Sequence, residues 1–232
     1  MSFFEIIPVT NQQEAAAIVE QKLQDELNAG TLNVLGLATG STMIPIYKQL
    51  VESDLNFSHV TAFNLDEYIG LPSTNENSYA YFMQQQLFLR KPFKVTNIPN
   101  GMAENLEAEC ERYENLLNEY PLDIQFLGVG ENGHIAFNEP GTSFDAVTHV
   151  ANLTDSTLGV NAQYFGDNEE MPTTAYTMGI ASIMKAKKII LLAFGEKKRL
   201  ALEALLGDEI TEEWPITVLK NHPHVSVITD IN

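Results

Sequence analysis

Residues 128–140 contain the side chains of this sequence that are best suited to acid–base chemistry. The segment reads Gly-Val-Gly-Glu-Asn-Gly-His-Ile-Ala-Phe-Asn-Glu-Pro, so acidic residues lie on both sides of His134. A histidine held by a carboxylate can act as a general acid or base near neutral pH. The glycines indicate that the backbone passes close to another group. A single histidine can also be structural, and the segment alone leaves both interpretations open.

Residues 63–68, Phe-Asn-Leu-Asp-Glu-Tyr, place two adjacent carboxylates at the end of an apolar run. If Asp66 lies in a partly dry cleft, its carboxylate can remove a proton from a carbon next to a carbonyl. The alternative is that Asp66 or Glu67 caps a helix or a loop. Taken by itself, the acidic pair favours this alternative.

Residues 37–42, Leu-Ala-Thr-Gly-Ser-Thr, follow an apolar run and precede a helical pattern. Gly40 permits close approach of the backbone, and the hydroxyls of Ser41 and Thr42 lie beside the free N–H groups of a helix start, which is a favourable site for an anion. The segment is neither a Walker A loop nor a GxGxxG fingerprint, so a nucleotide is not implied. The alternative is that Ser41 or Thr42 simply caps the helix.

Three consecutive cations, Lys197, Lys198 and Arg199, begin another predicted helix. Positive charge at a helix start opposes the helix dipole, and an anionic ligand would explain it. Solvated surface charge is the alternative. The histidines have no metal-ligand spacing, no HExxH or paired-cysteine pattern occurs, and no GxSxG elbow is present. The sequence therefore predicts neither a metal site nor a cofactor, and its one cysteine, Cys110, excludes an internal disulfide.

The elements that must position these residues alternate between helix and strand. Helical periodicity covers residues 10–28, 43–51, 76–90, 105–120 and 196–206, and strand patterns cover residues 33–38, 60–65, 124–129, 188–194 and 224–229. Such alternation is typical of an α/β fold with a Rossmann-like, mostly parallel sheet flanked by helices. Ligands of such sheets bind beyond the carboxyl ends of the strands, where the loops described above begin.

The length of 232 residues suits a single domain covering residues 1–232. Thr10 and Gln13 predict a capping box at the first helix. Residues 141–171 are the least regular part of the sequence, and both a lid over the site and a surface excursion fit them.

The charge balance limits the partners. Thirteen Lys and Arg residues face thirty-one Asp and Glu residues, for a formal net charge of -18. Nucleic acids and anionic membrane surfaces are therefore not expected partners, and a phosphate site must be built locally. No 18-residue apolar run and no signal-peptide pattern occur, so we expect no membrane span and a cytoplasmic location.

Over essentially its whole length the chain resembles the glucosamine-6-phosphate isomerase family, which includes the glucosamine-6-phosphate deaminases. The resemblance is carried by the motifs at residues 37–42, 63–68 and 128–140. It implies conversion of glucosamine 6-phosphate and water to fructose 6-phosphate and ammonia, a hydrolase reaction of amino-sugar catabolism, without metal or cofactor. It implies that Asp66 carries a proton between C2 and C1 and that His134 is the ring-opening base.

The same resemblance implies that Asn132 and Glu139 support ring opening and that the phosphate is held by Gly40, Ser41, Thr42 and Lys198. Many family members have Asp at the position of Asn132. An amide carries no charge, so we expect Glu139 to take more of the orienting role.

Other departures concern regulation. A lid Arg of many relatives corresponds to Gln163, and the positions of an allosteric Arg and Lys correspond to His149 and Ala151. We therefore expect no activation by N-acetylglucosamine 6-phosphate, and a monomer or small homo-oligomer in place of a hexamer.

Two alternatives remain at this stage. A 6-phosphogluconolactonase shares the fold and a similar glycine-rich histidine loop. Such lactonases tend to have Arg where this chain has Tyr68, and they lack the Phe-Asn-Glu-Pro segment at residues 137–140. A non-catalytic sugar-phosphate sensor would explain Gln163 and Asn132. The presence of Asp66 and His134 argues against it.

Overall fold

The computed structural model describes residues 3–154, 159, 165 and 171–231. Its centre is a seven-stranded sheet in the order β1-β10-β9-β6-β2-β3-β5, and every neighbouring pair is parallel. The strands are β1 (Phe3–Pro8), β2 (Val34–Leu37), β3 (Thr61–Asn64), β5 (Val95–Asn97), β6 (Ile124–Gly128), β9 (Lys188–Ala193) and β10 (His224–Thr229). The predicted α/β fold with a mostly parallel sheet is confirmed.

The central strands are apolar because helices cover both of their faces. Every residue of β2 and β3 is buried, as are five of the six residues of β9. A strand buried on both faces has no polar face and reads as a continuous apolar run. The core between sheet and helices includes fully buried Phe63, Phe126 and Tyr113.

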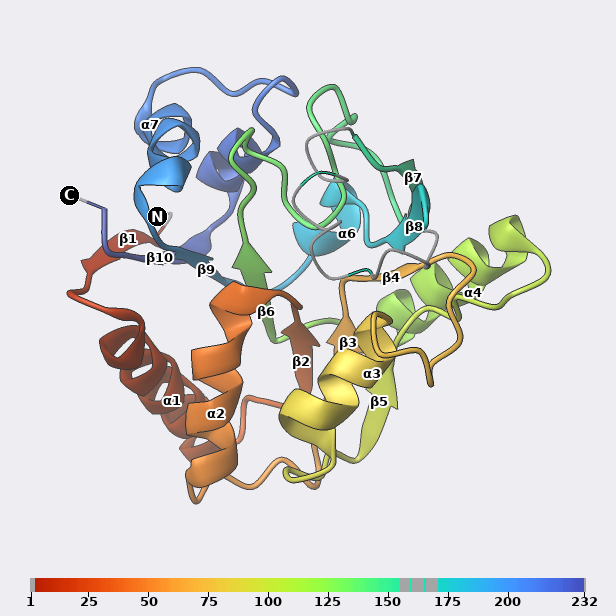
Figure 1. The fold of residues 1–232 in the computed structure, drawn as a ribbon. Coiled ribbons are helices and arrows are strands. Elements are labelled where there is room, and N and C mark those ends of the chain that lie inside the picture. The colour runs from red at the N-terminus through yellow and green to blue at the C-terminus, as the bar shows by residue number, and fades with distance from the viewer. Residues whose placement is uncertain (1–2, 155–158, 160–164, 166–170, 232) are drawn as a thin grey trace.

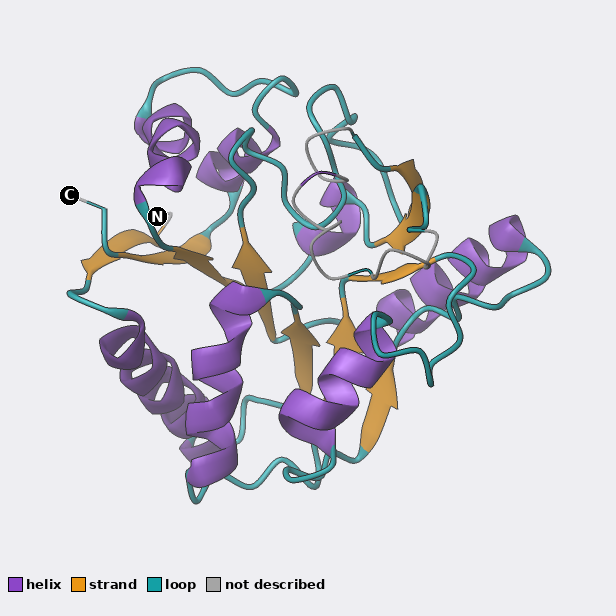
Figure 2. Cartoon of the chain, in the orientation of Figure 1, coloured by secondary structure: helices purple, strands orange, loops and turns teal. Residues whose placement is uncertain are grey.

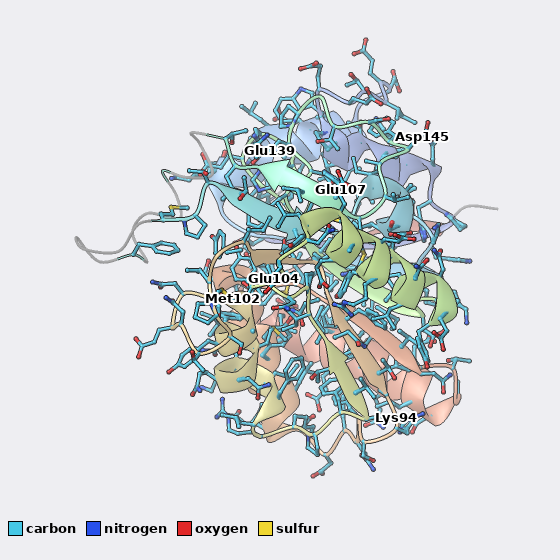
Figure 3. The ribbon with its side chains drawn as sticks, turned by 90° about the vertical axis from the view of Figure 1, so that its right-hand side faces the viewer. Lys94, Met102, Glu104, Glu107, Glu139 and Asp145 are labelled. Atoms are coloured by element: carbon cyan, nitrogen blue, oxygen red, sulfur yellow. The ribbon has the colours of Figure 1, made fainter. Side chains whose placement is uncertain are left out.

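Helices connect the strands. They are α1 (Gln12–Asn28), α2 (Ile44–Glu52), α3 (Tyr79–Met83), α4 (Leu106–Glu119), α6 (Ile180–Ile183) and α7 (Arg199–Leu206). A π-helical turn, η2 (Gln84–Phe88), continues α3, and short 3₁₀ turns occur at η1 (Ser41–Met43), η4 (Glu196–Lys198) and η5 (Pro215–Asn221). In Figure 1, α1, α2 and α3 form the near layer. Figure 3 shows α4 crossing the side of the molecule beside β5.

The strand order reverses direction between β2 and β6. From β2 the sheet extends through β3 to β5, and from β6 it extends through β9 to β10 and β1. The loops that leave the carboxyl ends of β2 and β6 therefore diverge to opposite sides. Such a switch point leaves a crevice in which α/β proteins bind ligands.

A second, antiparallel sheet of three strands lies beyond this end of the main sheet (Figure 2). Its strands are β4 (Asp66–Tyr68), β8 (Thr174–Thr177) and β7 (His149–Asn152), in the order β4-β8-β7. The sequence pattern does not predict this sheet, because strands of three or four residues carry too little periodicity.

Strand β7 belongs to the segment predicted to be irregular, so that prediction is wrong for residues 149–152. Residues 155–158, 160–164 and 166–170, which include Gln163, lie outside the described residues. The role of residues 141–171 as a lid stays a prediction.

The N-cap of the first helix lies one residue later than predicted. Asn11, not Thr10, is the N-cap, and its side chain accepts a hydrogen bond from the N–H of Glu14 at 2.9 Å. Glu14 reaches back to the N–H of Thr10 at 2.7 Å. The predicted capping box at Thr10 and Gln13 is therefore wrong in register. No helix within the described residues is long and apolar enough to cross a membrane.

Candidate active site

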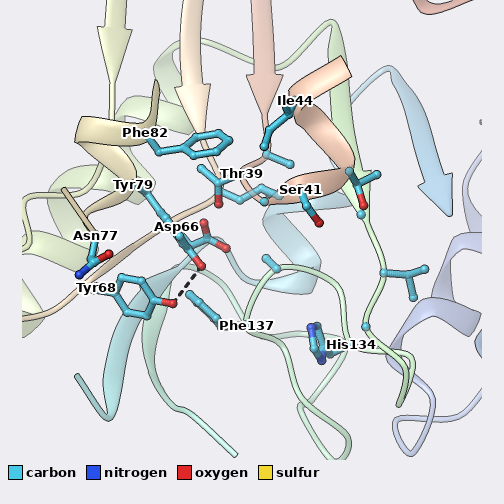
Figure 4. Close-up of a pocket in the computed structure, with 18 of the residues that line it drawn as sticks. Thr39, Ser41, Ile44, Asp66, Tyr68, Asn77, Tyr79, Phe82, His134 and Phe137 are labelled. Carbon is cyan, nitrogen blue, oxygen red and sulfur yellow. Dashed lines mark hydrogen bonds between the residues drawn. The ribbon is translucent and has the colours of Figure 1, made fainter. Parts of the chain in front are cut away.

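A cavity of about 350 Å³ lies at the switch point, between the loops that follow β2 and β6 (Figure 4). Six residues predicted for the site line it: Gly40, Ser41, Thr42, Asp66, His134 and Lys198. The other two, Asn132 and Glu139, are hydrogen-bonded behind His134. The three motifs therefore converge, as expected for loops at one end of a parallel sheet.

The loop after β2 lines one side of the cavity and has the features of a site for an anion. Gly40 has φ of 99°, a left-handed conformation that favours glycine. The N–H of Met43 donates to Gly40 O at 3.0 Å, which starts the helical turn η1. The first N–H groups of a helical segment have no partner within it, so this turn offers donors to an anion.

Lys198 supplies positive charge to the same cavity. It follows β9 in η4 and is half-buried, and burial lowers the pKa of its ammonium group while the nearby Glu131 carboxylate acts in the opposite direction. The other two cations of the cluster face acids: Lys197 Nζ lies 3.3 Å from Glu131 Oε1, and Arg199 pairs with Glu196. Of the three predicted cations, only Lys198 lines the cavity.

Asp66 lies in β4 and is 6% exposed. Its Oδ1 is buried and accepts no hydrogen bond from any described residue. Burial, together with the neighbouring Glu67 charge, raises the pKa of Asp66 to about 8. A carboxylate with so little stabilisation of its charged form is a stronger base than one in water, which suits proton abstraction.

Glu67 points away from Asp66 and does different work. Its Oε1 accepts hydrogen bonds from the N–H groups of Tyr68 at 2.8 Å and Tyr79 at 2.9 Å, and its Oε2 accepts from the N–H of Ala80 at 2.8 Å. Burial raises the pKa of Glu67 to about 7, although these N–H groups oppose the shift. Successive strand residues face opposite sides, so one acid caps α3 while the other lines the cavity.

His134 is held by a relay of two residues. His134 Nδ1 lies 2.7 Å from Asn132 Oδ1, and Asn132 Nδ2 donates to Glu139 Oε2 at 2.8 Å. Glu139 Oε2 also lies 3.4 Å from His134 Nδ1. The Glu139 carboxylate fixes the orientation of the amide, whose oxygen then accepts the Nδ1 proton. This assigns the tautomer in which Nε2 is free to accept a proton.

The glycine at 130 is explained by the histidine. A Cβ on Gly130 would lie 2.2 Å from His134 Cε1, so only glycine lets the ring pack against the backbone there. Gly130 N also donates to His134 O at 2.9 Å. The loop therefore folds back on itself around the histidine.

Three aromatic rings, of Tyr68, Tyr79 and Phe137, also line the cavity and were not predicted from the sequence. The Tyr68 and Tyr79 ring centroids lie 4.8 Å apart, and the rings of Tyr79 and Phe137 are stacked at 6.0 Å. The Tyr79 hydroxyl donates to the Tyr68 hydroxyl at 3.3 Å, the dashed line in Figure 4. All three rings line the cavity together with Asp66. No sequence signal separated Tyr79 from the other aromatic residues of its helix.

The chain is similar to known proteins over nearly its whole length. Residues 10–228 match the family described as glucosamine-6-phosphate isomerases/6-phosphogluconolactonase. The glucosamine-6-phosphate deaminase of Streptococcus uberis is 50% identical over 225 residues, which cover 97% of this chain and 96% of that protein. The enzyme of the same name from Listeria monocytogenes is 50% identical over 226 residues, with 97% of each chain covered.

Solved structures give the same result. One of a monomeric glucosamine-6-phosphate deaminase is 40% identical, with a TM-score of 0.92, and the match covers 97% of this chain and 96% of that one. The 6-phosphogluconolactonase of Trypanosoma brucei is 21% identical with a TM-score of 0.78, covering 99% of this chain and 97% of that one. The lactonase likeness concerns the fold alone.

Proposed function

The chain belongs to the family of glucosamine-6-phosphate isomerases and 6-phosphogluconolactonases, and on that premise we propose that it is an enzyme, a glucosamine-6-phosphate deaminase of amino-sugar catabolism. It converts glucosamine 6-phosphate and water to fructose 6-phosphate and ammonia. The relatives that are about 50% identical over nearly the whole chain carry this name.

The observation that carries the proposal is the shared cavity of about 350 Å³. A buried carboxylate, a histidine with a free Nε2 and a local anion site line it together. An amino-sugar phosphate needs all three, because its reaction combines ring opening, proton transfer between carbons and the anchoring of a phosphate.

We assign the phosphate to the helical turn that begins after Gly40. The N–H groups and hydroxyls of Ser41 and Thr42 donate to the phosphate oxygens, and Lys198 neutralises part of its charge. Burial lowers the pKa of Lys198 in the free protein. A bound phosphate stabilises the ammonium form, so substrate binding opposes this shift.

Ring opening is assigned to His134. Its Nε2 accepts the proton of the C1 hydroxyl, the C1–O5 bond breaks to give the C1 aldehyde, and the imidazolium then returns that proton to the ring oxygen. The positive charge that develops on the imidazole is stabilised by the Asn132 amide oxygen at 2.7 Å. Glu139 stabilises it through its 2.8 Å hydrogen bond to Asn132 and its own 3.4 Å contact with His134.

Isomerisation is assigned to Asp66. The aldehyde acidifies the C2 proton, which the carboxylate removes to give an enolamine. Asp66 returns the proton to C1, which leaves an iminium carbon at C2. Water adds to that carbon and ammonia departs, so the ketone of fructose 6-phosphate remains.

The proposal is tested by incubating the purified protein with glucosamine 6-phosphate and measuring ammonia and fructose 6-phosphate. Both products should appear in equal amounts. A parallel incubation with 6-phosphogluconolactone should show no hydrolysis above the spontaneous rate. Absence of both products from folded protein would contradict the deaminase assignment, and lactone hydrolysis would replace it.

We further propose a cytoplasmic location and a monomer or small homo-oligomer. A structure of similar fold and 40% identity is that of a monomeric deaminase, which supports the second point. Light scattering of the purified chain measures the mass directly. A hexamer would contradict the proposal.

A further inference from the structure

Residues 211–217 form a turn outside the cavity. This turn hydrogen-bonds to the loop of residues 129–144, which contains His134. The N–H of Ile216 donates to Gly133 O at 2.9 Å. The N–H of Gly141 donates to Glu212 O at 2.8 Å, and the N–H of Phe144 donates to Glu212 Oε1 at 3.0 Å. The turn therefore contacts the loop before His134 and again after Glu139, on both sides of the ring-opening relay.

Trp214 packs against the loop at Gly133. Gly133 has φ of 82°, and a Cβ there would lie 2.6 Å from Trp214 Cε3. The indole thus packs directly on the backbone between Asn132 and His134. Any displacement of this ring moves the peptide that joins two members of the relay.

The turn is closed internally by hydrogen bonds to Thr217. The Thr217 hydroxyl accepts a hydrogen bond from the N–H of Thr211 at 2.9 Å. It faces two carbonyl acceptors for its own proton, Trp214 O at 2.7 Å and Thr211 O at 3.0 Å. Thr217 is 1% exposed. A turn closed in this way by a buried hydroxyl can act as a fixed support.

We propose that residues 211–217 are a positioning element for ring opening, in which Trp214 and Glu212 fix the geometry of the Asn132, His134 and Glu139 relay. Neither residue lines the cavity, so both act through the loop. The inference rests on the proposed deaminase function. The physical reason is that catalytic groups must be held within a fraction of an ångström by supporting contacts.

The first test compares Glu212→Ala with Glu213→Ala. Both remove an exposed carboxylate, but only Glu212 accepts the hydrogen bond from Phe144. Glu212→Ala should lower kcat about 3- to 10-fold with KM within about 2-fold, because the phosphate loop is untouched. Glu213→Ala should match the wild type. Equal kcat values for the two variants, or a change confined to KM, would overturn the proposal.

A second readout does not depend on activity. The titration of His134 in the free protein is followed by NMR of labelled histidine and assigned with a His134→Asn variant. Its midpoint should differ from wild type in Glu212→Ala and agree with wild type in Glu213→Ala. If deamination is absent but the midpoint moves, the function fails and the positioning role stands. An unchanged midpoint with a lowered melting temperature would reduce the turn to a structural role.

Trp214 provides a graded series. Trp214→Phe keeps a flat ring on Gly133 and should retain most of kcat, whereas Trp214→Ala should lose about 10-fold or more. Trp214 is the one tryptophan of the sequence, so its emission in Glu212→Ala reports directly on the contact. If Trp214→Ala does not fold, the Glu212 and Glu213 pair decides. Equal kcat in the Phe and Ala variants would contradict the proposal.

Discussion

The surroundings of Asp66 favour its neutral form. They destabilise the ionised carboxylate and also make that carboxylate a stronger base. It is almost fully buried, it has an unpartnered oxygen, and Glu67 is its neighbour in the chain. Each of these features penalises the ionised form. The same features make the ionised form a strong base when it does exist, which is the condition that proton abstraction from carbon requires.

Asp66→Asn should abolish deamination, lowering kcat by about 1000-fold or more, because an amide cannot accept the C2 proton. Incubation in deuterated water measures the step itself. Solvent hydrogen should enter the substrate carbons with wild type and not with the variant. Persistent exchange in Asp66→Asn would remove this residue from its proposed role.

The same variant should be more stable than wild type at neutral pH. The pKa of Asp66 rises from about 3.8 in the unfolded chain to about 8 in the folded protein. The folded state therefore binds the Asp66 proton more tightly than the unfolded chain does. The stability that this proton contributes is fully present below a pH of about 4 and is lost as the pH rises through about 8. The melting-temperature advantage of Asp66→Asn should be near zero at pH 4 and reach about 2 °C or more at pH 8. An advantage that does not grow with pH would contradict the assigned burial penalty.

Strand β4 and helix α3 act as one unit because Glu67 joins them. Three N–H groups, two of them at the start of α3, converge on this one side chain. Ser78 completes the helix start by accepting a hydrogen bond from the N–H of Tyr81 at 3.0 Å. The arrangement fixes Tyr79 against the cavity and keeps a negative charge beside Asp66.

Glu67→Gln should shift the acidic limb of kcat/KM to lower pH, because removing the Glu67 charge lowers the pKa of Asp66. At pH 7.5, where Glu67 with its pKa of about 7 is mostly ionised in wild type, the activity relative to its plateau should rise about 2-fold in the variant. Ser78→Ala is the matched control. It removes the N-cap of the same helix and should cost about 1 kcal/mol of stability without moving the limb. A limb that moves equally in both variants would show that helix disruption, not charge, sets it.

The molecule as a whole repels its proposed substrate. A formal net charge of -18 at pH 7 opposes the approach of a sugar phosphate. The crevice at the switch point offsets this with a local site, in which N–H groups and Lys198 face the cavity. We therefore expect affinity for the phosphate to come from that crevice and not from the overall surface.

Two residues of the small sheet bear on regulation. His149 and Ala151, at the positions of an allosteric Arg and Lys in some relatives, both lie in β7 of the small sheet. Neither supplies a permanent cation to a phosphate. We expect the velocity at subsaturating substrate to change by less than about 2-fold when N-acetylglucosamine 6-phosphate is added. A several-fold activation would contradict the expectation and show a second phosphate site.

The sequence by itself determined the class of the fold and the three segments that line the cavity. Buried parallel strands read as apolar runs wherever they occur, and residues 37–42, 63–68 and 128–140 follow three such runs directly. These signals are local, so a few neighbouring residues suffice to carry them. The motifs at 37–42 and 128–140 lie at the carboxyl ends of β2 and β6, which are neighbouring parallel strands, so the two motifs lie side by side.

The tertiary structure alone decided which member of each motif faces the cavity. Asp66 and Glu67 divide their roles because β4 pairs with β8, where Asp66 lies opposite Thr177. Lys198 is separated from its neighbouring cations because Glu131 and Glu196 hold those. Trp214 packs on Gly133, which lies 81 positions earlier in the sequence. Each of these contacts joins residues far apart in the chain or depends on a side-chain direction, and local periodicity encodes neither.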